Sequence, residues 1–102
     1  MQNMLEREVI LTAVKEKIFA EIRDLPIHVY LFGSWARGQE RPTSDIDIAL
    51  DAEGEMDGRV LLVVREALEE STIPYRVDVV DMTKADIRLV ENIRKEGILW
   101  TE

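Results

Sequence analysis

The sequence predicts an α/β (α+β) fold in which helices flank a small mixed sheet. Three observations support this prediction: an amphipathic pattern near the N-terminus, short apolar runs rich in β-branched residues, and two later helical patterns that alternate with those runs. The expected order is helix, strand, strand, helix, strand, helix, which suits helices packed on one sheet. The chain has 102 residues and no repeat or linker, so we expect one domain over residues 1–102.

The first half of the chain contains one predicted helix and two predicted strands. Apolar residues recur at helical spacing over residues 4–24, and Pro26 ends that pattern. The run IHVYLFG at 27–33 is short and rich in β-branched and aromatic residues, which predicts a strand. In DIDIALD at 45–51, aspartate and apolar residues alternate, which predicts a second strand. The segment between the two strands reads as a connection.

The second half alternates in the same way. RVLLVVREALEE at 59–70 predicts a helix whose apolar stripe is Val60, Val63, Val64, Ala67 and Leu68. YRVDVVDM at 75–82 predicts a third strand. A last helix is expected over 83–97, with Thr83 as its N-cap and Gly97 at its end. The final ILW segment is either a short strand or a tail.

Carboxylates inside apolar strands are the most informative feature. Asp45 and Asp47 are two residues apart, so a strand projects both from one face. Two anions repel each other by up to roughly 4 kcal/mol at about 4 Å and an effective dielectric constant of about 20, and a divalent cation offsets that repulsion. Asp78 lies between two valines of the third predicted strand and joins the pair if the strands are neighbours. The three acids therefore predict a Mg²⁺ site, with two ions able to clamp a phosphoryl group.

A glycine-serine turn precedes the acids. Gly33 permits close approach of a ligand to the backbone, and Ser34 adds a hydroxyl donor. Backbone N–H groups at such a turn bind phosphate oxygens without cationic side chains. Gly33 and Ser34 are therefore candidate binding residues for the phosphates of a nucleotide.

Each feature alone has an ordinary structural interpretation. A glycine-serine pair after a strand is usually only a turn, and an alternating pair of aspartates often marks a solvent-facing strand. Arg37 is a candidate phosphate contact or an ion-pair partner of an acid such as Glu40. Trp35 is more typical of packing than of base stacking. The functional hypothesis depends on the combination and the spacing.

Composition excludes several classes of function. The net charge of -8 argues against direct nucleic-acid binding, because phosphate backbones require clustered Lys and Arg. With no cysteine and one histidine, disulfides, thiolate catalysis and the usual zinc sites are excluded. No run of about 20 apolar residues predicts a membrane span, and the N-terminus lacks a signal-peptide pattern. We therefore expect a cytoplasmic protein without membrane association.

Gly33-Ser34, ten intervening residues and then Asp45-x-Asp47 form a specific combination. This pattern resembles the signature of the DNA polymerase β-like nucleotidyltransferase superfamily. GSWARGQERPTSDIDIAL is similar to the version in minimal nucleotidyltransferases, the MNT proteins, and the resemblance covers nearly the whole chain. It implies a nucleotidyltransferase fold in which the glycine-serine pair contacts the nucleotide, the two signature aspartates bind Mg²⁺, and Asp78 completes the triad.

The same resemblance implies a biological role. MNT proteins are typically encoded beside HEPN-domain proteins and are thought to act as antitoxins that move AMP from ATP to a tyrosine of the toxin. By that likeness, ATP is the substrate and a HEPN-type toxin is the partner, in a homo- or hetero-oligomer. Leu61 and Leu62 widen the apolar face of the 59–70 helix, which favours an interaction surface there, although that face could equally be core.

Two alternatives remain open. The first is transfer to a small-molecule hydroxyl, such as that of an aminoglycoside, although a chain of 102 residues has little material for an acceptor pocket. The second is a non-catalytic antitoxin that neutralises its partner by covering it. The complete set of three acids favours an active enzyme.

Overall fold

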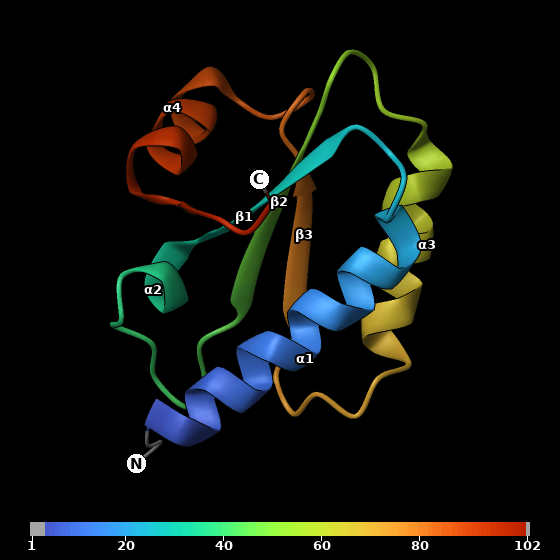
Figure 1. The fold of residues 1–102 in the computed structure, drawn as a ribbon. Coiled ribbons are helices and arrows are strands. Elements are labelled where there is room, and N and C mark those ends of the chain that lie inside the picture. Colours follow the sequence, from blue (N-terminus) through green and yellow to red (C-terminus); the bar gives the residue numbers. More distant parts are fainter. Residues whose placement is uncertain (1–3, 102) are drawn as a thin grey trace.

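A four-stranded sheet with helices on both faces forms the frame of the protein. The computed structural model describes residues 4–101. Figure 1 shows the elements in chain order, namely α1 (Met4–Ile22), β1 (Ile27–Phe32), α2 (Gly33–Ala36), β2 (Ile46–Ala52), α3 (Gly58–Glu69), β3 (Val77–Asp81), α4 (Ile87–Glu96) and β4 (Ile98–Leu99). The predicted α/β fold with a small mixed sheet is confirmed.

The strands are arranged in the order β3-β2-β1-β4. β1 pairs with β2 and with β4 in antiparallel fashion, whereas β2 and β3 are parallel. A parallel pair requires a crossover, and α3 provides it between β2 and β3. As a result β3 lies at one edge of the sheet, next to the strand that carries Asp47.

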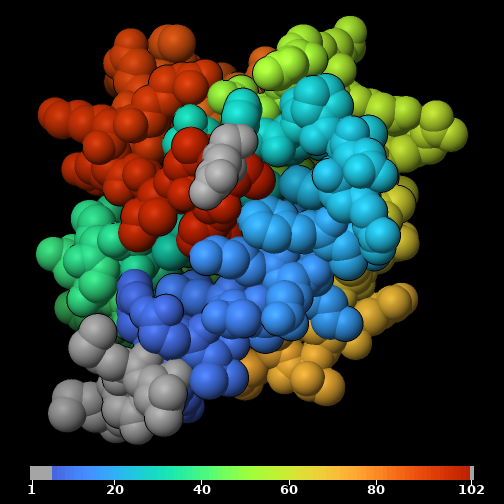
Figure 2. Space-filling view, viewed as in Figure 1, coloured from blue at the N-terminus to red at the C-terminus, as the bar shows by residue number. Residues whose placement is uncertain are grey.

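The two faces of the sheet bury different residues. Ile46, Ile48 and Leu50 of β2 are buried in the main core, which also contains the apolar stripes of α1 and α3. Ala49, with the opposite parity, packs with Ile93 of α4 in a smaller cluster. Asp47 therefore projects from the α4 face. Figure 2, in the view of Figure 1, shows the side chains of α1 covering the sheet behind it.

Two local predictions differ from the structure. The first helix ends at Ile22 rather than near residue 24, and Leu25 lies in the following turn, where its side chain is exposed. The last helix has Asp86 as its N-cap, which accepts a hydrogen bond from the Arg88 backbone N–H. Thr83 is not the cap, because its N–H and hydroxyl both donate to Asp81 in a turn that precedes the helix.

Further predictions concern α3, the C-terminal segment and membrane spans. On α3, Val64 and Leu68 are buried as predicted, but Val63 is 42% exposed and lies outside the apolar stripe. The ILW segment contributes the strand β4, which resolves the choice between a strand and a tail. Within residues 4–101, none of the helices is both long enough and apolar enough to cross a membrane.

Candidate active site

Asp47 and Asp78 lie side by side on neighbouring strands. The parallel register pairs Asp47 of β2 directly with Asp78 of β3. Paired residues of adjacent strands project from the same face at a backbone spacing of about 4.8 Å. The burial pattern explains why each strand presents an acid there: the flanking Ile46 and Ile48 turn into the core, as does Val79. Asp47 and Asp78 are therefore neighbours in the sheet, as the sequence predicts.

Asp45 lies just outside the strand. β2 begins at Ile46 instead of residue 45, and the Asp45 side chain is exposed. It is nevertheless close enough to affect its neighbour electrostatically. The pKa of Asp47 is raised above its usual value, first because the carboxyl is partly buried and then because Asp78 and Asp45 are negatively charged, while Arg37 acts in the opposite direction. The three predicted acids therefore share one local field centred on Asp47.

Gly33 lies against the carboxylate of Asp47. It follows β1, whose last residue Phe32 pairs with Asp47, and it has a φ of +73°. A Cβ at this position would overlap Oδ2 of Asp47, so only glycine fits. Ser34 comes next, in the first turn of α2. The glycine-serine turn and the acids, eleven or more positions apart in the chain, are thus brought together by the β1–β2 pairing.

Trp35 fixes the short helix α2 in place. Its side chain is fully buried, and its indole Nε1 donates to the Ser44 backbone oxygen at 3.3 Å. Its ring meets Tyr75 edge-on, with the ring centroids 5.0 Å apart. The interpretation of Trp35 as a packing residue is confirmed.

Arg7 supports the same turn from α1, which the sequence did not indicate. Its Nε donates to Oε2 of Glu40 at 3.0 Å, its Nη2 donates to the Trp35 backbone oxygen, and its guanidinium lies 5.9 Å from the centre of the Trp35 ring. Glu40 is therefore paired with Arg7 and not with Arg37, which forms an exposed ion pair with Glu96 at 3.7 Å. No local pattern links positions 7 and 40, so only the fold reveals this contact.

Two other strand aspartates have structural partners. Asp51, on the face of Asp47, accepts from Arg94 of α4 at 3.1 Å. Asp81, buried at the end of β3, holds the turn before α4 through Thr83. The carboxylates of Asp51 and Asp81 thus have partners. In contrast, the carboxylates of Asp47 and Asp78 form no hydrogen bond or ion pair among residues 4–101.

The acids fit Mg²⁺ bound together with a phosphate ligand better than a self-sufficient metal site. Among residues 4–101, no group of three His, Cys, Asp or Glu side chains is arranged to hold a metal ion by itself. Mg²⁺ usually takes only one or two carboxylates and completes its coordination with water and substrate phosphates. Burial is the main cause of the raised pKa of Asp47, and the negative charges of Asp78 and Asp45 add to it; a bound cation would relieve that repulsion.

Comparisons with known proteins agree with this geometry. The family described as "Polymerase beta, Nucleotidyltransferase" matches residues 16–102. A probable protein adenylyltransferase MntA of Haemophilus influenzae is 36% identical over 74 residues, covering 72% of this chain and 65% of the relative. The protein adenylyltransferase MntA of Shewanella oneidensis is 34% identical over 73 residues, covering 71% of this chain and 52% of the relative. This chain thus spans less than two thirds of either relative.

Solved structures show the same fold. A toxin-antitoxin structure with AMP-PNP superposes with a TM-score of 0.68 at 30% identity, covering 86% of this chain and 73% of the other. A complex of tri-AMPylated Shewanella oneidensis HEPN toxin with MNT antitoxin gives a TM-score of 0.68 at 25% identity, covering 94% and 73%. Because the family match extends over most of the sequence, the chain belongs to the polymerase beta nucleotidyltransferase family.

Proposed function

We propose that this protein is a Mg²⁺-dependent nucleotidyltransferase that moves AMP from ATP to a tyrosine hydroxyl of a HEPN-type toxin and so acts as an antitoxin. The observation that carries the proposal is the alignment of Asp47 with Asp78 directly beside Gly33. The relatives named protein adenylyltransferase and the AMPylated toxin complex supply the reaction and the partner class. The catalytic unit is a single domain over residues 1–102.

The site residues divide into two groups. Asp45, Asp47 and Asp78 are the proposed ligands of two Mg²⁺ ions, and Gly33 and Ser34 the proposed contacts of the triphosphate tail. When bound, Mg²⁺ supplies charge neutralisation at the phosphates and acidifies the attacking hydroxyl. The backbone N–H groups of the turn and the Ser34 hydroxyl are the donors that orient the leaving phosphates.

In the proposed reaction, the acceptor tyrosine oxygen forms a bond to the α-phosphorus while the bond between that phosphorus and the bridging oxygen of pyrophosphate breaks. Asp78 accepts the hydroxyl proton, and pyrophosphate departs along the Gly33-Ser34 turn. Phosphoryl transfer of this kind needs little covalent participation by the protein, so positioning and charge compensation account for the catalysis.

The test is direct transfer in a purified system. The protein is incubated with the HEPN-type protein encoded beside it, ATP and Mg²⁺, and the partner is examined by intact mass and peptide mapping. The expected result is a gain of about 329 Da per AMP on a tyrosine of the partner. Asp47→Asn should abolish the gain. Asp51→Asn is the matched control, because Asp51 shares the strand and the face but pairs with Arg94.

Neutralisation of the toxin is measured in parallel. If Asp47→Asn protein still suppresses the partner's toxicity fully at equal concentration, without modification of either chain, the protein acts by covering and the enzymatic role is refuted. If the wild-type protein modifies an aminoglycoside but not the partner, the acceptor class is refuted while the chemistry stands.

A further inference from the structure

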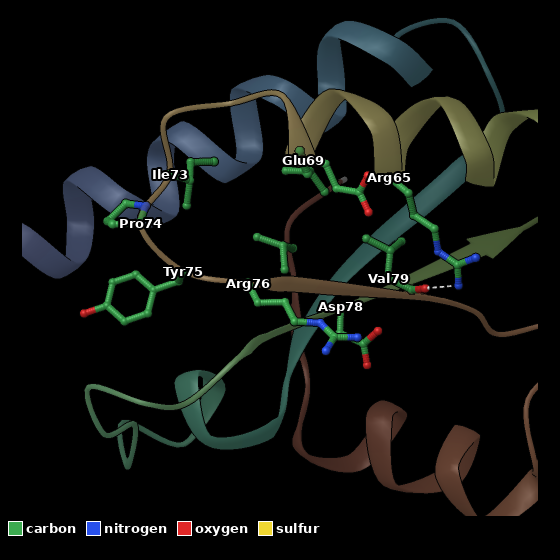
Figure 3. Close-up of a pocket in the computed structure, with 10 residues that line it drawn as sticks. Arg65, Glu69, Ile73, Pro74, Tyr75, Arg76, Asp78 and Val79 are labelled. Carbon is green, nitrogen blue, oxygen red and sulfur yellow. Dashed lines mark hydrogen bonds between the residues drawn. The ribbon is translucent and has the colours of Figure 1, made fainter.

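A groove runs along the free edge of the sheet and reaches the acid cluster. It has a volume of about 630 Å³ and lies between α3 and the edge strand β3. Figure 3 shows its lining: side chains of α3 on one side, the segment that leads into β3, and Asp78 at the far rim. Asp78 therefore belongs both to the groove and to the candidate active site, so the two are continuous.

The sheet order places the groove and the phosphate turn on opposite sides of the acids. Because the strands run β3-β2-β1, a row forms from Asp78 on β3, Asp47 on β2 and Gly33, which directly follows β1. Gly33 closes the β1 end of the row, against the Asp47 carboxylate. Within the described residues 4–101 no further strand follows beyond Asp78, and the groove occupies that side.

Transfer of a nucleotidyl group requires the attacking oxygen and the leaving oxygen to lie roughly in line, on opposite sides of the phosphorus. If pyrophosphate leaves toward Gly33, the acceptor hydroxyl must approach from the β3 side. We propose that the groove between α3 and β3 is the docking site for the tyrosine-bearing segment of the toxin. This inference rests on the proposed function and assigns the acceptor a place within it.

The lining suits an extended piece of polypeptide. Leu68 and Ile73 give the groove an apolar side on which an aromatic ring can pack. The outer edge of β3 offers main-chain groups, and one of them, the Val79 oxygen, accepts a hydrogen bond from Nη2 of Arg65 at 2.8 Å. Such an edge can equally pair with the backbone of an incoming strand.

Arg76 places a positive charge at the rim of the groove. Figure 3 shows its side chain beside that of Asp78, on the same side of β3. Arg76 is exposed, and within residues 4–101 its side chain forms no hydrogen bond or ion pair, although its backbone oxygen accepts from the Ile46 N–H. On a protein of net charge -8, this cation at the rim can hold an acidic or carbonyl group of the docked segment next to the catalytic acids.

The experiment separates docking from nucleotide binding. Glu69→Trp fills the groove from its α3 side, whereas Asp78 lies on β3, and Arg76→Ala removes the rim cation. Glu21→Trp and Lys17→Ala are matched exposed changes on α1, a helix that contributes no residue to the lining of the groove. For all four variants we measure the KM for the HEPN-type partner in AMP transfer and the Kd for a non-hydrolysable ATP analogue with Mg²⁺.

The expected result is an increase of about tenfold or more in the KM for the partner in Glu69→Trp, and of several-fold in Arg76→Ala, as for the loss of a central contact at an interface. The Kd for the ATP analogue should stay within about twofold of wild type for Glu69→Trp, as should both constants for the two α1 controls.

Two results would overturn the docking proposal. In the first, Glu69→Trp and Arg76→Ala transfer AMP with the wild-type KM for the partner. In the second, Glu69→Trp weakens the ATP analogue as much as it weakens the partner, which would assign the groove to the nucleotide. A wild-type protein that transfers no AMP to the partner would refute the proposed function itself, and this outcome is distinguishable from both.

Discussion

The carboxylates of Asp47 and Asp78 belong to directly paired residues of two parallel strands and project from the same face of the sheet. Neither carboxylate has a hydrogen bond or ion pair within residues 4–101, whereas Asp51, four residues after Asp47 on the same face of β2, is paired with Arg94. The fold thus concentrates negative charge at one point and compensates it elsewhere. A site of this kind is less stable empty than occupied, and this determines its response to pH and to ligands.

The first prediction concerns pH. The pKa of Asp47 is raised in the folded state, so ionisation of this group costs more in the folded than in the unfolded chain. Below the unfolded pKa of 3.8 the Asp47 carboxyl is protonated in both states and does not oppose folding. As the pH rises through the folded pKa, the carboxyl ionises and the folded state loses stability relative to the unfolded chain. Asp47→Asn should therefore raise the melting temperature at pH 7. That gain should shrink toward zero below pH 3.8. Thermal melts from pH 3 to pH 8 measure it.

A second prediction concerns ligand binding. Mg²⁺ with ATP should stabilise the protein, because both bind only the folded site, by about 2.7 kcal/mol when the ligand is present at about 100 times its Kd. Mg²⁺ alone should shift the melting temperature much less, since no three carboxylates among residues 4–101 enclose a metal ion. Asp47→Asn should lose the response to both. A wild-type melting temperature unchanged by millimolar Mg²⁺ and ATP would rule out the site as described.

A third prediction tests the fit of Gly33. Gly33→Ala places a Cβ on the Asp47 carboxylate and adds the strain of a left-handed backbone, and AMP transfer should fall by roughly 100-fold, as for a misplacement of about 1 Å. Gly54→Ala is the control, because Gly54 also has a positive φ, +85°, but has open space around it. Both variants should lose about 1–2 kcal/mol of stability from backbone strain. Equal activities would show that the close approach is irrelevant to the reaction.

The fourth prediction concerns Arg7 and Glu40, whose side chains are 20% and 11% exposed. Arg7→Met leaves the Glu40 carboxylate largely buried without its partner and should destabilise the protein by about 1–3 kcal/mol. The double variant Arg7→Met with Glu40→Met should recover most of that loss, because the cost comes from the unpaired charge. Chemical denaturation of both variants measures the difference, and a double variant no more stable than the single would contradict this account.

Much of the site could be predicted from the sequence because each of its residues stands in a recognisable local sequence pattern. Asp47 and Asp78 are acids inside apolar strands, and Gly33-Ser34 ends another strand, so each is visible without the fold. Their spacing resembled a known signature, and the family match confirmed that likeness. The roles assigned to these residues nevertheless stay predictions until the variants are measured.

The remaining features depend on contacts between distant segments. The Arg7–Glu40 pair joins residues 33 positions apart, and nothing in the local pattern selects Arg7 over other basic residues. The groove exists because β3 is an edge strand, and strand order is not encoded in hydrophobic periodicity. The sequence pattern did not identify the N-cap of α4, because Thr83 and Asp86 are both good N-cap residues. In the structure the N–H and hydroxyl of Thr83 donate to the buried Asp81, so Asp86 is the cap.

The fifth prediction concerns the exposed face of α3. Leu62 is 54% exposed and Val63 is 42% exposed, whereas Val64 is fully buried. Leu62→Lys and Val63→Lys should each change the free energy of unfolding by no more than about 0.5 kcal/mol, as is usual at the surface. Val64→Lys should prevent folding, because it buries an unpaired charge in the core. Circular dichroism melts of the three variants distinguish these positions.

The same variants test whether this face of α3 contacts a partner. Two exposed apolar side chains on adjacent positions are more than the fold itself needs, since Val64 and Leu68 already anchor the helix to the core. If the face is an interface, Leu62→Lys should weaken binding of the HEPN-type protein by about tenfold, which corresponds to about 1.4 kcal/mol for burying a charge in place of an apolar contact. Calorimetric titration of the folded variant measures this directly. Because Leu62 does not line the groove beside Asp78, Leu62→Lys should weaken partner binding without altering the Kd for the ATP analogue. If Leu62→Lys and Val63→Lys both bind the HEPN-type protein with wild-type affinity, this face of α3 does not contact the partner. Partner contact is then restricted to the neighbourhood of the acids.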